Sequence, residues 1–159
     1  MTDSDVPSPR DTPLSDATRE RLQGISLALL RLHKVLLGVE RGAYEKLYGR
    51  VLSGSELLQL LIQNPWFSWL GQVSKLVVQI DEMLDRAKAK KKEPVTEQEA
   101  GAVLEQVRSL LRPDEDSGSD ETFSRRYKQA LQQDPNSILA HAEVIRFLPG
   151  VSPDSPPSN

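Results

Sequence analysis

The sequence predicts an all-α fold, an antiparallel helical bundle of four main helices with short connecting helices. Apolar residues recur every three or four positions over residues 22–47 and again over residues 66–87. Only an α-helix brings positions with this spacing onto one face. No segment alternates polar and apolar residues as a half-buried strand does, and no Asn-Gly or Asp-Gly pair marks a hairpin. The two long amphipathic helices must therefore pack against other elements.

Composition excludes several classes of function. The chain has 159 residues, of which 38% are hydrophobic and 27% are charged, as in a globular domain. The absence of cysteine excludes disulfides, zinc–thiolate sites and thiol catalysis. A net charge of −3 gives no support for binding to nucleic acid or to a membrane surface. No apolar run approaches the roughly 18 residues that span a bilayer, and the acidic, Pro-rich start has no leader pattern, so we expect a cytoplasmic protein.

One helical bundle domain is predicted over residues 15–148. Residues 1–14 combine charged residues with Pro, Ser and Thr, and they cannot bury enough apolar surface to fold. Residues 149–159 are interrupted by repeated prolines, which break any regular element. Both tails are therefore predicted to be disordered.

Capping residues define the first two helices. The first helix is predicted over residues 16–48, followed by Gly49 at the position where a left-handed residue ends a helix. Ser53 and Glu56 have the spacing of a capping box. This pair predicts a short helix over residues 54–63.

The same signals divide the middle of the chain. The Asn64-Pro65 pair predicts the start of a long helix over residues 65–90, because Asn caps a helix and Pro fits its first turn. Thr96 and Glu99 form a second capping box and predict the start of the next helix.

The last two helices are predicted over residues 121–133 and from Asp134-Pro135 onward. The final helix is expected to point three residues inward: Ile138, Ala142 and Ile145. Short connections predict that neighbouring helices are antiparallel. The predicted core of the whole bundle includes Leu29, Leu36, Trp69, Val73, Ile80, Leu104 and Val107.

Several short motifs are distributed over residues 32–82. They are Leu32-His33-Lys34, Glu40-Arg41, Tyr44-Glu45, Glu56–Leu61, Asn64–Leu70 and Ile80-Asp81-Glu82. Together they resemble a family of small uncharacterised bacterial proteins, and the resemblance covers residues 22–148. Its most distinctive part is Pro-Trp-Phe-x-Trp-Leu. The resemblance implies a compact all-helical fold in a bacterial cytoplasm, and it implies no activity.

A histidine and a carboxylate are predicted on one side of the first helix. His33, Glu40 and Tyr44 are separated by seven and four positions. Together with His141 from the last helix, His33 and Glu40 are the candidate ligands of a metal site between helices. The Glu-x-x-His spacing of such sites is absent, and the chain has only two histidines. We therefore expect no cofactor and interpret His33 as a hydrogen-bonding residue, with a metal- or small-ligand-binding bundle as the alternative function.

An aromatic cluster lies just after the second predicted helix. Trp66 and Trp69 fall on the apolar stripe of the helix predicted over residues 65–90, and we expect both in the core. Phe67 points about 100° away from that stripe. Unless another helix covers it, Phe67 is a candidate partner-binding residue.

The densest positive charge lies at the end of the same predicted helix. It includes Lys88, Lys90, Lys91 and Lys92. Cations are favourable near the C-terminal end of a helix, so a solvated helix end is one interpretation. The other interpretation is a partner-binding patch. The run has no interleaved aromatic residues and no recognition-helix pattern, which argues against nucleic acid.

These features predict a non-catalytic protein that binds another macromolecule or itself. The chain has no nucleophile motif, no phosphate-binding loop and no paired acids in a recognised frame, so we expect that it is not an enzyme. A second apolar stripe on the first helix needs its own partner: Leu30, Leu37, Tyr44 and Val51. Either the later helices cover this stripe, or a second copy covers it in a homodimer. The identity of a protein partner is not encoded in any of these motifs.

Overall fold

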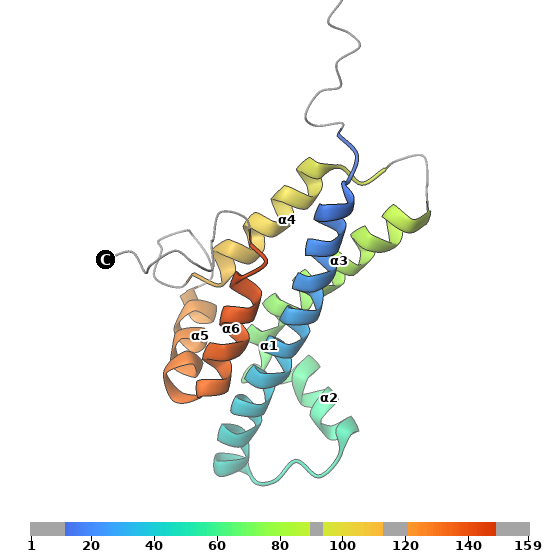
Figure 1. The fold of residues 1–159 in the computed structure, drawn as a ribbon. Helices are drawn as coiled ribbons and strands as arrows, with labels where there is room; N and C mark the ends of the chain where they lie inside the picture. Colours follow the sequence, from blue (N-terminus) through green and yellow to red (C-terminus); the bar gives the residue numbers. More distant parts are fainter. Residues whose placement is uncertain (1–11, 90–93, 113–120, 149–159) are drawn as a thin grey trace, which may run out of the picture.

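A computed structural model describes residues 12–89, 94–112 and 121–148. These residues contain six α-helices, one 3₁₀ helix and no strand (Figure 1). The elements are α1 (Asp16–Tyr48), α2 (Gly54–Gln63), η3 (Ser68–Leu70), α3 (Gly71–Ala89), α4 (Glu97–Leu110), α5 (Glu121–Gln133) and α6 (Pro135–Ile145). The predicted all-α class is confirmed.

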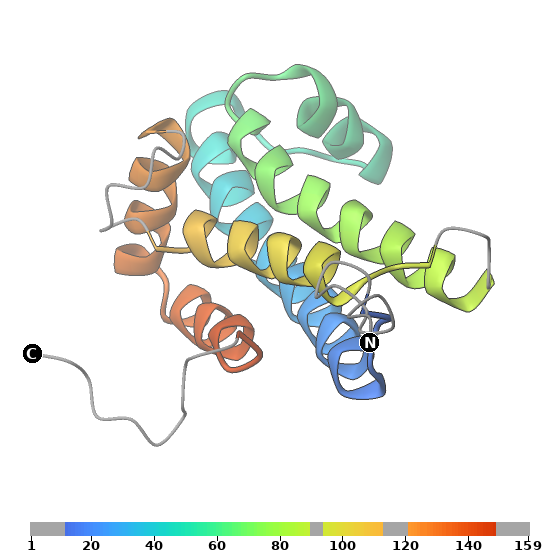
Figure 2. The ribbon, with the colours of Figure 1, turned by 90° about the horizontal axis from the view of Figure 1, so that it is seen from above.

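The long helix α1 is the centre of the fold. It packs mainly against α3 and α6, and α5 lies beside α6 and η3. Seen from above, α4 crosses over α1, with α3 on one side and the α5–α6 pair on the other (Figure 2). This arrangement around a central helix does not confirm the finer prediction of an antiparallel four-helix bundle.

Most helix bounds follow from local capping, as predicted. The side-chain oxygens of Ser15, Ser53 and Thr96 each accept a hydrogen bond from the N–H three residues later, at 3.1 Å. Asp134 caps α6 by accepting from the N–H of Asn136. Gly49 ends α1 with a φ of +97°, a conformation that L side chains rarely adopt.

The start of α3 differs from the prediction. The residues after Asn64 form consecutive tight turns, with hydrogen bonds from Phe67 N–H to Asn64 C=O and from Ser68 N–H to Pro65 C=O, before α3 begins at Gly71. The prediction of one helix from Pro65 is therefore wrong. On an α-helix, residues 67 and 69 lie about 160° apart and cannot both face one core. The turn buries both.

The core lies between α1, α3, α4 and the α5–α6 pair, and it buries the seven residues predicted as the core of the whole bundle: Leu29, Leu36, Trp69, Val73, Ile80, Leu104 and Val107. The predicted inward face of α6 is wrong, because Ile138 and Ala142 are exposed and Ile145 is only partly buried. The buried residues of α6 are Ser137, Ala140 and Val144. Apolar residues surround this helix, so their spacing does not select one face.

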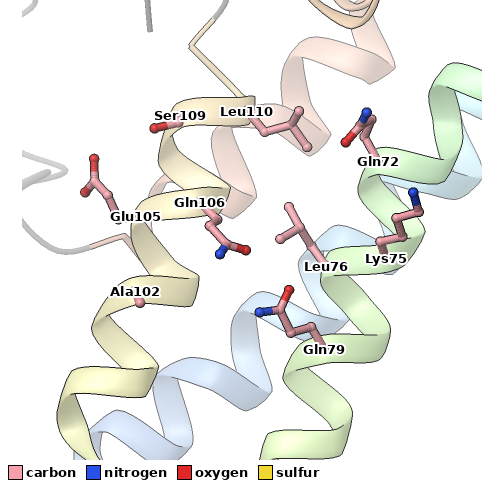
Figure 3. A pocket seen from close by; sticks show the side chains of 9 residues that line it. All are labelled: Gln72, Lys75, Leu76, Gln79, Ala102, Glu105, Gln106, Ser109 and Leu110. Atoms are coloured by element: carbon pink, nitrogen blue, oxygen red, sulfur yellow. The ribbon is translucent and has the colours of Figure 1, made fainter. Parts of the chain in front are cut away.

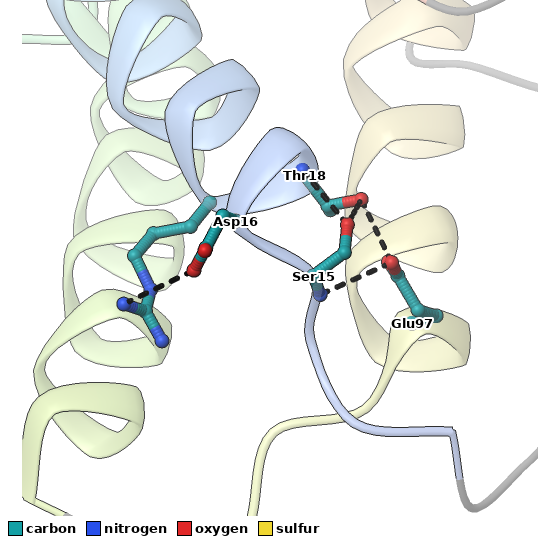
Figure 4. Close-up of polar contacts among 5 residues, drawn as sticks. Ser15, Asp16, Thr18 and Glu97 are labelled. Carbon is teal, nitrogen blue, oxygen red and sulfur yellow. Dashed lines mark hydrogen bonds and ion pairs between the residues drawn. The ribbon is translucent and has the colours of Figure 1, made fainter.

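The chain that leads into α1 is joined to the start of α4. Leu14 N–H donates to Val95 C=O at 3.2 Å, and Glu97 N–H donates to Thr12 C=O at 2.9 Å. The Glu97 carboxylate accepts from the Thr18 hydroxyl at 2.9 Å and from Ser15 N–H at 3.2 Å (Figure 4). Residues 12–14, assigned to the tail by sequence, thus contact the helical domain in the structure.

Helix α1 is long and apolar enough to cross a bilayer by length and composition, although no such segment was expected from the sequence. Core helices of soluble proteins pass the same test. Here one face of α1 is covered by α3 and α6.

Candidate functional site

A group of exposed apolar side chains in the described residues belongs to the C-terminal end of α1, the connection after it and α2, and these segments lie together at one end of the fold (Figure 1). We call it the α2 surface; its residues are Leu47, Tyr48, Leu52, Leu58 and Ile62. Leu52 is 83% exposed and Ile62 is 73% exposed. Isolated exposed leucines are normal in soluble proteins, but a group of this kind within one short segment is typical of an interaction site.

Helix α2 is itself unusual, because it is rich in leucine and none of its residues is buried. It lies mainly against η3, and its side chains Leu60 and Leu61 are partly buried against the core. Leu58 and Ile62 are four residues apart, so they lie on the same face of the helix. This face points away from the core.

The C-terminal end of α1 also differs from its prediction. The apolar stripe predicted to continue to Leu47 is buried only as far as Leu36, and Leu47 is exposed. In the second stripe, Leu30 is exposed, whereas Leu37 and Tyr44 are partly buried against the core. The later helices therefore cover α1 only in part.

Phe67 is not on this surface. It is only 1% exposed and contacts Tyr44, with 5.4 Å between the ring centroids. The interpretation of Phe67 as an exposed partner-binding residue is therefore wrong. Trp66, expected in the core, is instead half-buried. In the predicted helix, Trp66 would face the core and Phe67 would point away from it. The tight turn after Asn64 reverses these positions.

The predicted lysine patch lies partly outside the described residues. Lys88 is exposed near the end of α3, where it complements the helix dipole. Lys90, Lys91 and Lys92 lie outside the described residues. In the described part of the chain, Arg86 forms an ion pair with Glu99 of α4 and so links α3 to α4.

A buried carboxylate connects three elements. Glu40 of α1 is only 7% exposed, and its Oε2 lies 3.5 Å from the guanidinium of Arg126 in α5. The same guanidinium lies over the ring of Trp66, 5.1 Å from its centroid. The indole N–H groups of Trp69 and Trp66 lie close enough to lower the pKa of Glu40, but neither makes a hydrogen bond of ordinary geometry. We call these four residues the Glu40 cluster.

The net effect of the surroundings is to raise the pKa of Glu40. Burial, which disfavours the charged carboxylate, is the largest cause, and it outweighs the opposing effects of Arg126 and the two indoles. No sequence signal identified this cluster, because its members come from three separate segments. Sequence spacing placed Glu40 only at the edge of the α1 stripe.

The two histidines are not brought together with Glu40 as metal ligands. In the described residues, no group of three or more His, Cys, Asp or Glu side chains has the arrangement of a metal site. His141 Nδ1 lies 2.6 Å from the hydroxyl of Tyr127. His33 makes no side-chain hydrogen bond within the described part of the chain, so the hydrogen bond expected for it is not found.

Burial explains the state of the Tyr127–His141 pair. Burial lowers the pKa of His141 and raises the pKa of Tyr127, so both groups are uncharged near neutral pH. The tautomer of the neutral imidazole sets the direction of this hydrogen bond: the Tyr127 hydroxyl donates when the ring proton is on Nε2, and Nδ1–H donates when it is on Nδ1. This pair fixes the packing of α5 on α6.

A cleft of about 430 Å³ opens between α3 and α4 (Figure 3). Gln72 and Gln79 line it from α3 and Gln106 lines it from α4, above the apolar side chains of Leu76 and Leu110. Its charged members are Lys75 and Glu105, and both are exposed. The cleft offers amide hydrogen bonds, but none of its ionisable groups is buried.

Comparison with known proteins identifies no relative: no family model, no curated protein and no solved structure matches the chain. The resemblance to a family of small bacterial proteins therefore stays a prediction.

Proposed function

We propose that the protein is a non-catalytic helical interaction protein, located in the cytoplasm, and that the α2 surface pairs it with a second copy of itself. The observation that carries this proposal is that α2 is rich in leucine but none of its side chains is fully buried. Burying one exposed Leu or Ile stabilises a complex by about 1.5–3 kcal/mol before the cost of association. A partner that covers Leu58 and Ile62 supplies the missing burial.

The charge on this helix favours a second copy as the partner. Glu56 is the only ionisable residue of α2, and its carboxylate accepts a hydrogen bond from Leu52 N–H at 3.2 Å. Two copies can therefore meet through Leu58 and Ile62 without placing like charges opposite each other. An uncharged apolar face is complementary to itself, and two-fold pairs are the commonest assemblies of identical chains.

Sedimentation velocity at protein concentrations from roughly 1 to 100 μM tests the proposal, because this range brackets a Kd of about 10 μM. We expect the wild-type protein to form a dimer over this range. Leu58→Glu and Ile62→Glu place a charge on the face and should give monomers. Leu27→Glu is the matched control, because Leu27 is an exposed leucine of α1 outside the α2 surface.

The control should remain a dimer, and far-ultraviolet circular dichroism should show that all variants keep their helices. A wild-type protein that stays monomeric at the highest concentration overturns the pairing. So does a dimer that survives both substitutions in α2, since the contact must then lie elsewhere.

A further inference from the structure

The Glu40 cluster holds the turn between α2 and α3 against α1. Residues 64–70 form this turn, and they carry both tryptophans of the chain. Trp69 is buried and Trp66 is half-buried, each with its indole nitrogen shielded from solvent. Both indoles are directed to the region of the Glu40 carboxylate closely enough to affect its ionisation.

The polar atoms of this cluster are poorly satisfied. Glu40 Oε2 and the indole nitrogens of Trp66 and Trp69 are buried, and none of them makes a hydrogen bond to the described residues. The ion pair with Arg126, at 3.5 Å, is longer than a close charge-assisted hydrogen bond. An ionised carboxylate that is buried without enough hydrogen bonds destabilises the packing of the turn on α1. A neutral carboxylic acid in the same place destabilises it much less.

The position of α2 depends on this turn. Asn64 N–H donates to Leu60 C=O, which ends α2, and Asn64 Oδ1 accepts from Trp66 N–H at 2.9 Å. Helix α2 lies mainly against η3, the last part of the same turn, and has no buried residue of its own to anchor it. A turn that loosens from α1 therefore takes α2 with it.

We propose that Glu40 is a proton-sensitive tie, which holds the 64–70 turn and α2 firmly against α1 when it is neutral and loosens them when it is ionised. The tie would regulate the α2 surface, and in that respect alone it rests on the proposed function. Ionisation favours water around the carboxylate, and the turn is the element that must move to admit it.

In the described part of the chain, one charged side chain faces Glu40 closely enough to affect its ionisation. Arg126 of α5 is the charged group that faces the carboxylate, and the turn contributes the two indole N–H groups. Burial opposes ionisation more strongly than these three groups favour it, so the pKa of Glu40 lies above the ordinary value for a glutamate. Stability contributed by the neutral form is therefore present at low pH and is lost as the pH rises through the raised pKa.

Tryptophan fluorescence reports this titration directly, because both tryptophans lie in the cluster. We expect an emission change between pH 4 and pH 8 in the wild-type protein, with a midpoint above the usual range of a glutamate. Glu40→Gln should abolish this transition. Glu105→Gln, which alters an exposed carboxylate of α4, should leave the transition unchanged. A transition that persists in Glu40→Gln overturns the proposal.

A second variant keeps the test decisive if Glu40→Gln fails to fold. Arg126→Met removes the cation that lowers the pKa of Glu40, so it should move the fluorescence midpoint to higher pH. An unchanged midpoint contradicts the proposed role of the carboxylate.

The effect on α2 is measured by hydrogen exchange at pH 7. We expect amides of residues 57–63 to exchange several-fold faster in the wild-type protein than in Glu40→Gln, where the tie is permanently neutral. Equal exchange rates show that the cluster does not control α2.

Both experiments are repeated in the Ile62→Glu background, which is monomeric under the proposed function. If the wild-type protein does not dimerise but the titration and the exchange difference remain, the proposed function fails and the tie stands. If the dimer forms with the same affinity at pH 5 and pH 8, pairing stands and regulation by Glu40 fails.

Discussion

The aromatic ring of Phe147 fills the space that a side chain on Gly24 would need. Phe147 follows α6, and three atoms of its ring lie too close to the Cβ position of residue 24 for a larger residue to fit unless the ring moves. Gly24 therefore marks the closest approach of α1 to the end of α6. Gly38 and Gly42, also in α1, have no neighbouring atom within 4 Å of their Cβ positions.

This difference predicts opposite effects of the same substitution. Gly24→Ala should lower the free energy of unfolding by about 1–3 kcal/mol, because crowding against Phe147 outweighs the better helix propensity of Ala. Gly38→Ala should raise it by about 0.5–1 kcal/mol, because nothing obstructs the new methyl group. Urea unfolding of the two variants measures both. Stabilisation by Gly24→Ala would contradict the contact.

Phe67 is buried in the core and Ile62 is exposed on the α2 surface, so the same substitution should affect stability differently at the two positions. Phe67→Ala should cost about 3–5 kcal/mol of stability, because it removes a fully buried ring. Ile62→Ala should change stability by no more than about 0.5 kcal/mol in the monomer. Denaturant midpoints at low protein concentration, where no dimer forms, provide the comparison. A large loss for Ile62→Ala would mean that α2 is packed more tightly than its exposure indicates.

Hydrogen bonds to the Glu97 carboxylate link the start of α1 to α4, and this link should weaken in acid. Although burial alone would raise the pKa of Glu97, hydrogen bonds from Ser15 and Thr18 hold it below the ordinary glutamate value of 4.5. The stability it contributes is therefore present above pH 4.5 and lost as the pH falls through the lowered pKa. Glu97→Gln should lower the free energy of unfolding by at most about 1 kcal/mol at pH 7, because the carboxylate and its hydrogen-bond partners are accessible to solvent. The difference in free energy of unfolding between Glu97→Gln and the wild type should disappear at pH 3. A difference that persists there contradicts this role of Glu97.

The Tyr127–His141 pair should have a stabilising role. Tyr127→Phe removes the hydrogen bond between the hydroxyl and His141 Nδ1 at 2.6 Å, and we expect a loss of about 1–2 kcal/mol in the free energy of unfolding. Chemical denaturation at pH 7.5, where His141 is neutral, measures it. The control is Gln129→Ala, which changes an exposed side chain of the same helix. Equal stability of Tyr127→Phe and Gln129→Ala would show that the hydroxyl contributes nothing.

Both histidines should make the fold sensitive to mild acid. Burial lowers the pKa of His33 and of His141 below the ordinary histidine value of 6.5. Their neutral forms stabilise the fold fully above pH 6.5, and this contribution is lost as the pH falls through the lowered values. Glu40 acts in the opposite direction, so the Glu40→Gln background isolates the effect. We expect the free energy of unfolding to fall between pH 6.5 and pH 5 in that background; a flat profile contradicts burial of the two rings.

Local signals predicted the bounds of the helices well, because a cap needs only residues close together in the sequence. Ser53 and Thr96 were recognisable from the spacing of a capping box and Asp134 from the Pro that follows it, and each accepts the expected type of hydrogen bond. Asn64 has the same sequence signature but closes a turn. The burial of Phe67 and Trp69 decides this case, and burial depends on contacts with distant residues.

The candidate sites were less predictable for the same reason. Glu40 looks like an edge residue of an amphipathic helix until Arg126 and the two tryptophans are placed around it. The packing of the Phe147 ring against Gly24 could not be predicted either, because these residues lie far apart in the sequence. The α2 surface could not be recognised from the spacing of its leucines, because they resemble those of a buried helix.

The packing of α6 on α1 has a consequence for how the protein folds on the ribosome. The ion pair between Arg31 and Glu143 joins residues 112 positions apart, and Phe147 reaches Gly24 across a still longer separation. Helical proteins fold fastest when their contacts are local. Two helices, α3 and α6, provide most of the cover for the apolar stripe of α1. Of these, α6 is translated more than a hundred residues after the start of the stripe. The part of the stripe that α6 covers therefore gains its cover only after α6 has been made, whereas α3 can cover its own part earlier, so the docking of α6 is a late step in folding.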